Sequence, residues 1–173
     1  NMIKEYRPRY TVLLNDDKTF PYVRITNEPY PRVVIIRAKH LTKDKHTYFG
    51  PYTDAGYLRD LVRSLHKIFP IRTCSYYIDS KSISEKKVSV CLDYHIKRCE
   101  GPCEGLVSES HYGNMIDQIK QFLKGRNKNI KRYLKDAMIQ ASDELRFEDA
   151  GRYRDQYQTV VSFTKRQKLL SQD

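Results

Sequence analysis

The sequence is poor in several features that would place it in a familiar class. It has no tryptophan, no cysteine before residue 74 or after residue 103, and only 39% hydrophobic residues. No apolar run approaches the roughly 20 residues of a membrane-spanning helix, so we expect a cytoplasmic protein without a membrane partner. The low hydrophobic content predicts modest cores for one domain or two small ones.

Acidic residues are also scarce. The chain of 173 residues has 21 Asp and Glu against 32 Lys and Arg, a formal net charge of +11. Such an excess favours a polyanionic partner, because cations that neutralise phosphates release counterions. The alternative is a basic surface that serves solubility alone.

The four cysteines are grouped as a local cross-link would be. They are Cys74, Cys91, Cys99 and Cys103, in the order Cys-x16-Cys-x7-Cys-x3-Cys. No apolar leader and no N-x-S/T pattern indicates an oxidising compartment, so reduced thiols that hold a metal are favoured over disulfides. Structural zinc sites usually contain a C-x2-4-C knuckle, which only the last pair offers. Irregular spacing suits an iron–sulfur cluster, whose corners accept thiolates from separate directions. The spacing alone leaves zinc and iron–sulfur open.

His95 is a second candidate beside the cysteines. At helical spacing Cys91, His95 and Cys99 share a face, so the imidazole is a possible ligand or the base of a catalytic thiol. With four cysteines available, a packed or solvated histidine is the simpler interpretation.

The pattern of apolar residues predicts an α+β chain. Strands are expected at residues 10–14, 22–26 and 33–36, and the polar residues 42–45 are expected to close a hairpin toward residues 48–52. A helix follows that Thr53 or Asp54 caps and Pro70 ends, and residues 75–89 are interpreted as a loop. Ser108 caps the next helix, which Gly125 ends, and two further helices start at residues 129 and 147. The fold is therefore a small antiparallel β-sheet, a helical four-cysteine module and a C-terminal antiparallel helical hairpin.

Two surfaces of this fold are candidates for binding. The first carries cations interleaved with tyrosines, a pattern that suits a nucleic-acid backbone and its bases; its cations are Lys18, Arg24, Arg32, Arg37, Arg59 and Arg63. The alternative is a thin core of tyrosines with solvated arginines. The second is the spare apolar stripe of the hairpin, which docks another helical pair, a copy of itself, or the helix at residues 108–124.

Four blocks of the chain resemble the UvrC family, the nuclease subunit of bacterial nucleotide excision repair. They are residues 16–22 (DDKTFPY), 48–52 (YFGPY), 69–74 (FPIRTC) and 91–103 (CLDYHIKRCEGPC). The final hairpin is similar to the UVR motif, although Arg146 replaces a common acidic residue and Gly151 a common alanine. Residues 1–10 resemble the end of a GIY-YIG nuclease domain, with Thr11 in place of an expected asparagine.

The resemblance implies a function and a division of the chain. It implies a 4Fe-4S cluster on the four cysteines, zinc being the alternative, and it implies damaged DNA and UvrB as partners. The residues implied to bind UvrB are Leu145, Phe147, Glu148, Ala150, Arg154, Asp155 and Gln156. The implied divisions are a GIY-YIG tail (1–14), the basic sheet (15–52), the cysteine module (53–107), a linking helix (108–126), the UVR hairpin (127–164) and a polar tail (165–173). The family's nuclease residues are not in this segment, so we expect no catalysis by it. The rival from another class is a zinc-binding interaction adaptor without a repair role.

Overall fold

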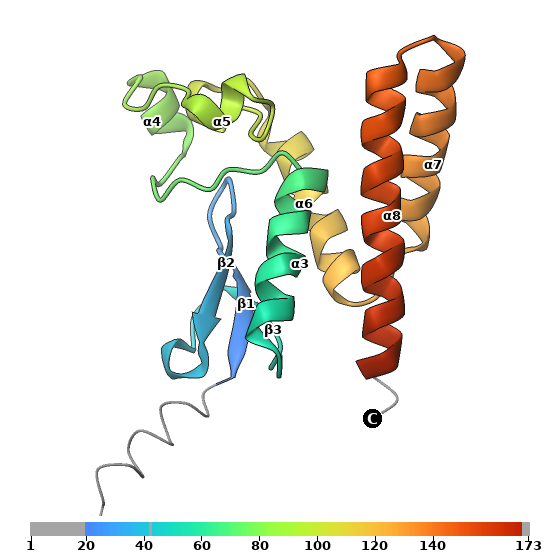
Figure 1. The fold of residues 1–173 in the computed structure, drawn as a ribbon. Helices are drawn as coiled ribbons and strands as arrows, with labels where there is room; N and C mark the ends of the chain where they lie inside the picture. The colour runs from blue at the N-terminus through green and yellow to red at the C-terminus, as the bar shows by residue number, and fades with distance from the viewer. Residues whose placement is uncertain (1–19, 42, 171–173) are drawn as a thin grey trace, which may run out of the picture.

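The computed structural model describes residues 20–41 and 43–170, without the side chains of residues 38 and 168–170. The strand predicted at residues 10–14 and the cation Lys18 lie outside the described residues. The described chain is α+β, as predicted, with a small antiparallel sheet before the helices (Figure 1). Its elements are β1 (Pro21–Ile25), β2 (Val33–Arg37), β3 (Thr47–Phe49), α3 (Ala55–Ile68), α4 (Ser80–Ser84), α5 (Leu92–His95), α6 (Glu109–Leu123), α7 (Lys128–Asp143) and α8 (Phe147–Leu170), with 3₁₀ turns at Ala38–His40 and Pro102–Glu104. No described helix is both long and apolar enough to cross a membrane.

The strand order differs from the predicted hairpin. The order is β2-β1-β3, so β3 pairs antiparallel with β1 rather than with β2. The connection after β2 begins with a 3₁₀ turn and continues to Thr47, which is longer than a tight hairpin and allows the chain to reach the free edge of β1. Two hydrogen bonds beside the strands hold β3 at the edge of β1: Tyr52 N donates to Pro21 O (3.0 Å), and Asn27 N donates to His46 Nδ1 (2.8 Å).

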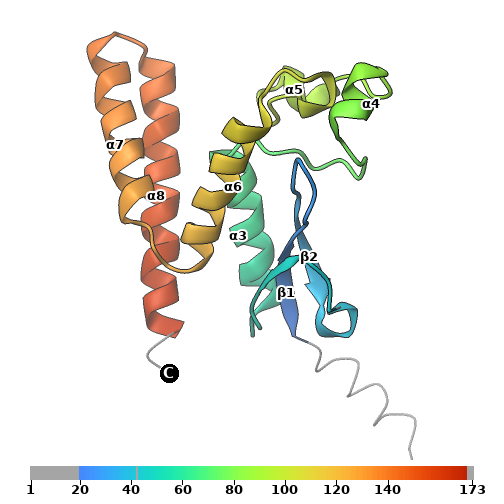
Figure 2. The ribbon, with the colours of Figure 1, turned by 180° about the vertical axis from the view of Figure 1, so that it is seen from behind.

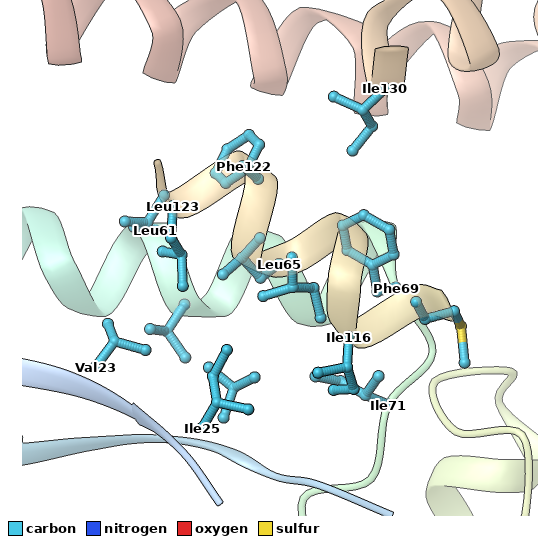
Figure 3. Packing of buried hydrophobic residues seen from close by; sticks show 14 of the residues in the cluster. Val23, Ile25, Leu61, Leu65, Phe69, Ile71, Ile116, Phe122, Leu123 and Ile130 are labelled. Atoms are coloured by element: carbon cyan, nitrogen blue, oxygen red, sulfur yellow. The ribbon is translucent and has the colours of Figure 1, made fainter. Parts of the chain in front are cut away.

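The core lies between the sheet and the hairpin. Figure 3 shows α3 and α6 in the middle, with the strands on one side and the hairpin on the other. Figure 2 shows from behind that α6 lies between α3 and the hairpin. Each layer contributes fully or nearly fully buried side chains, among them Val23, Ile25, Leu61, Leu65, Ile116, Phe122, Ile130 and Val160. Burial of this apolar surface is the main term that stabilises the arrangement.

The predicted helix ends are largely confirmed. Asp54 Oδ1 accepts a hydrogen bond from Tyr57 N (3.0 Å), and Ser108 Oγ accepts one from His111 N (3.1 Å), so each side chain satisfies a free amide of the first turn. Gly125 follows α6 with φ at +77°, a conformation that favours glycine.

The segment interpreted as a loop, residues 75–89, contains one helical turn. Asp79 and Ser82 cap α4 reciprocally, because the Ser82 amide donates to Asp79 Oδ1 (2.8 Å) and Asp79 N to Ser82 Oγ (2.9 Å). Ile78 is buried and Ile83 packs against the core. Five helical residues are too few to produce a periodic pattern, which is why the turn was missed.

The hairpin packs within the chain at one end and leaves apolar side chains exposed at the other. Near its open end Phe163 contacts Tyr57 (ring centroids 5.7 Å apart) and Phe122 (6.5 Å), so packing within the chain is confirmed there. Near the turn between α7 and α8 the apolar side chains remain outside: Leu145 is 72% exposed and Phe147 65%.

Candidate metal centre and partner surface

The four cysteines reach one place from four points of the backbone. Cys74 follows α3, Cys91 precedes α5, Cys99 follows α5, and Cys103 lies in the second 3₁₀ turn. All four line a single cavity of about 40 Å³. None forms a disulfide. The cavity is far smaller than the 300–1,000 Å³ typical of a site for an organic ligand.

Glycine makes the close approach of the last two cysteines possible. Gly101 has φ at +71°, and a Cβ there would lie 3.0 Å from side-chain atoms of Leu106 and Tyr94. Both the conformation and the crowding exclude a larger residue without a local shift. Gly101 therefore turns the chain between Cys99 and Cys103.

Burial keeps two of these thiols protonated when no cation is present. It raises the pKa of Cys99 to about 11, and the neighbouring sulfurs of Cys74, Cys91 and Cys103 add to the effect. The pKa of Cys103 is raised as well, again mainly by burial. Metal binding displaces such protons, because the thiolate is the ligand form. A thiol with so high a pKa is a poor nucleophile at neutral pH, which argues against the catalytic-thiol interpretation.

Among the described residues, no three His, Cys, Asp or Glu side chains converge closely enough to hold a single metal ion. His95 is exposed and does not line the cysteine cavity. The helix that would have aligned it with both cysteines ends after four residues, and Lys97 takes a positive φ of 60°.

Arg72, which the sequence analysis did not select, connects this centre to the rest of the fold. Its side chain is 1% exposed, and its Nη2 lies 2.8 Å from Glu28 Oε2, an ion pair whose N–H is not aligned for a hydrogen bond. Nε donates to Tyr30 O (2.8 Å) and Nη1 to Cys74 O (3.0 Å), with Cys74 Sγ at 3.6 Å. The guanidinium thus joins the β1–β2 connection to the first cysteine.

Tyr112 of α6 completes this network. Its hydroxyl accepts from Arg72 N (3.1 Å) and donates to Pro31 O (2.9 Å), and its ring meets Tyr30 edge to face at 5.3 Å. Burial raises the pKa of Tyr112, so the hydroxyl keeps its proton. The only sequence signal for Arg72 was its place two residues before Cys74, and a charged residue is ordinarily expected on the surface.

The predicted nucleic-acid residues do not form one patch. Arg24 is on the sheet face opposite Val23 and Ile25, and Arg37 ends β2, whereas Arg59 and Arg63 are exposed on α3. Because α3 covers the face of Val23 and Ile25, Arg24 lies on the side of that layer away from Arg59 and Arg63. Arg37 pairs with Pro21 and is therefore on the same face as Val23, at the end of its strand. Arg32 is held by Glu28 at 3.3 Å.

Most of the predicted partner residues are exposed around the hairpin turn. Leu145 has φ at +59°, rare for a leucine, and lies outside both helices. Phe147, Glu148, Arg154 and Asp155 are exposed, and Ala150 is half-buried. Gln156 is different, because its Nε2 donates to Lys67 O of α3 (3.1 Å).

Comparison with known proteins gives consistent matches. Residues 20–122 match the family described as UvrC/Cho excinuclease, middle domain, and residues 128–157 match the UvrB/UvrC motif. UvrABC system protein C of Chlorobium luteolum is 47% identical over the whole chain, and that of Alkaliphilus oremlandii is 45% identical over 99% of it. The chain spans 27% of the length of each of these relatives. No solved structure matches the chain significantly.

Proposed function

Since the chain belongs to the UvrC family, we propose that it is the non-catalytic central part of a protein that incises damaged DNA on both sides of a lesion. In this proposal the segment holds an iron–sulfur cluster, binds DNA and recruits the nuclease to UvrB. The matches to the middle domain and to the UvrB/UvrC motif support the assignment to the central part of the protein, because together they cover most of the described chain. The purified chain is expected to show no metal-dependent incision of damaged DNA.

The observation that carries the metal proposal is the meeting of four sulfurs at one cavity. Cys74, Cys91, Cys99 and Cys103 would hold a 4Fe-4S cluster, which supplies a four-point cross-link and one-electron chemistry. The all-sulfur donor set and the irregular spacing of the four cysteines support that group.

The chain's own residues would tie such a cluster to the fold. Arg72 donates to the carbonyl of Cys74 and lies against its sulfur, which orients this ligand and supplies positive charge beside it. Glu28 balances that charge from the β1–β2 connection. Through Arg72 and Tyr112, the cysteine ligands would be connected to the sheet and to α6, and the cysteine module would be held in one orientation against them.

The recruitment proposal rests on the exposed turn of the hairpin. Leu145 and Phe147 present large apolar side chains to solvent, the kind of surface that marks a protein interface. The matched UvrB/UvrC motif covers this turn.

The deciding experiment is an ultraviolet–visible spectrum with iron, sulfide and zinc analysis on protein purified without oxygen. We expect a broad band near about 400 nm and about four irons per chain. The matched control is Cys91→Ser, which removes one exposed ligand and should lose the band while the helical circular-dichroism signal remains. A colourless protein with about one zinc would favour the adaptor alternative, and a protein with neither metal would overturn a metal centre at this site.

A further inference from the structure

A groove separates the first turns of α8 from the C-terminal end of α3. Its volume is about 660 Å³, and its lining includes Lys67, Ile68, Arg98, Phe147, Arg154 and Gln156. We call it the α3–α8 groove. Figure 1 shows the C-terminal end of α3 on the side of α8 that faces the rest of the fold, and the side chain of Gln156 donates to Lys67 O there.

One wall consists of residues already expected to bind the partner. Phe147, Glu148, Arg154, Asp155 and Gln156 all line the groove. A partner helix that covers the exposed Phe147 ring from this side must therefore enter the groove. The partner surface is thus concave here and has a second wall.

The second wall comes from elements that the UvrB/UvrC motif does not include. Lys67 and Ile68 end α3, and Arg98 belongs to the cysteine module. Lys67 and Arg98 are exposed, and neither has a carboxylate within ion-pair distance in the described part of the chain. Burial lowers the pKa of His66, so this neighbouring imidazole is neutral at pH 7 and adds no charge.

The two cations of α8 that line the groove, Arg152 and Arg154, already have carboxylate neighbours. Arg152 lies 3.2 Å from Asp149, and Arg154 lies 3.2 Å from Asp155. Glu148 is the remaining carboxylate of the lining, so it offsets only part of the charge of Lys67 and Arg98. The groove therefore combines an apolar edge at Phe147 with a cationic wall opposite.

We propose that the α3–α8 groove receives an acidic amphipathic helix of UvrB, with Lys67, Ile68 and Arg98 as the second wall of the binding site. The proposal rests on the recruitment function above and extends it beyond the hairpin. The apolar side of the helix would cover Phe147 and Ile68, and its acidic side would face Lys67 and Arg98. Charge pairing of this kind sets orientation and partner choice.

This site also places the partner against the metal centre. Arg98 directly precedes Cys99, and the amides of both residues donate to the carbonyl of Asp93, at 2.7 and 3.1 Å. Asp93 itself lines the cysteine cavity. A helix bound in the groove therefore contacts the backbone turn that carries a proposed cluster ligand.

The test compares two matched charge reversals of the full chain in binding to purified UvrB. Lys67→Glu/Arg98→Glu changes the second wall, and Lys43→Glu/Lys45→Glu changes two exposed cations between β2 and β3 that do not line the groove. We expect the first pair to weaken binding about tenfold and to flatten its salt dependence, and the second pair to change affinity less than about twofold. The absorbance band monitors whether Arg98→Glu disturbs the metal centre.

A third variant separates this inference from the function on which it rests. Phe147→Ala should abolish UvrB binding if the hairpin recruits the partner at all. Loss with Phe147→Ala but not with Lys67→Glu/Arg98→Glu would overturn the second wall and leave recruitment intact, whereas binding that survives Phe147→Ala would overturn recruitment itself. A third outcome would overturn the proposed occupant. If the chain dimerises with concentration, and Lys67→Glu/Arg98→Glu removes the dimer but leaves UvrB binding unchanged, the groove belongs to a second copy of the chain.

Discussion

Arg72 shows how one side chain determines the relation between distant segments. Its guanidinium reaches Glu28 and Tyr30 before the helices, and Cys74 and Tyr76 after α3. A buried ion pair gains little over an apolar pair of the same shape, because removing both charges from water is costly. Its role is therefore best described as orientation: the planar guanidinium has donors in fixed directions, and these engage acceptors from both the cysteine module and the β1–β2 connection.

Replacing Arg72 by methionine should be strongly destabilising. The change leaves the Glu28 carboxylate, whose side chain is 9% exposed, with Arg32 as its neighbouring cation, and it removes the donors to the carbonyls of Tyr30 and Cys74. We expect a loss of about 3 kcal/mol in the free energy of unfolding. Urea denaturation measures this loss, with Arg72→Lys expected to lie between wild type and Arg72→Met.

The matched control is Arg63→Met. Arg63 pairs with Asp60 at 3.2 Å but is 68% exposed, so its removal should change stability by less than about 0.5 kcal/mol. Equal losses in the two methionine variants would show that the buried network contributes no more than a surface pair.

At the scale of elements, α8 combines two tasks along one helix. Its first turns carry the exposed Phe147 and one wall of the groove, while Val160 and Phe163 are buried against α3 and α6. The buried C-terminal half of α8 therefore holds its exposed first turns in place. Predicting the helix from its period was possible, but the period alone does not say which of its apolar residues are covered within the chain.

Gly151 lies in the interior of α8 where nothing requires a glycine. No atom lies within 4 Å of a Cβ placed there. Gly151→Ala should therefore stabilise the protein by about 1 kcal/mol through helix propensity, which corresponds to roughly 2–4 °C in Tm for a chain of this size.

Two other glycines serve as controls for that change. Gly113 in α6 is equally open, so Gly113→Ala should stabilise by a similar amount. Gly125 has φ at +77°, and Gly125→Ala should destabilise by about 1–2 kcal/mol. A stabilising effect at Gly125, or a destabilising one at Gly151, would contradict this explanation.

At the scale of the whole molecule, the charge of +11 is distributed rather than concentrated. Arg24 is on the face of the sheet away from α3, Arg37 is at the end of β2 on the other face, and Arg59 and Arg63 are exposed on α3. A straight duplex contacts one side at a time. Arg24 and Arg32 are half-buried, whereas Arg59 and Arg63 are exposed, so the α3 side offers the more accessible cations.

Binding of the chain to DNA should lose affinity steeply with salt and show little sequence preference. About three phosphate contacts would give a roughly 40-fold loss between about 50 and about 200 mM NaCl. In fluorescence anisotropy, Arg59→Gln/Arg63→Gln should reduce the salt slope by about 1 to 2, and Arg24→Gln/Arg32→Gln should leave it nearly unchanged. A flat salt response would contradict DNA binding, and the opposite ranking of the pairs would move the DNA to the sheet.

The sequence by itself determined what depends on neighbouring residues. Caps such as Asp54 and Ser108, the positive φ of Gly125 and the apolar period of α3 and α6 are local, so the limits of these helices were predictable. The grouping of the cysteines was equally visible in their spacing.

Only the tertiary structure decided which distant groups meet. It pairs β3 with β1, buries Arg72 beside Cys74, and places Arg98 opposite Phe147. Each of these depends on which strand edge, buried acceptor or helix face is still unoccupied once the layers pack. That information belongs to the packed whole, because a contact between residues far apart forms only where the rest of the fold compensates the entropy of ordering the chain between them.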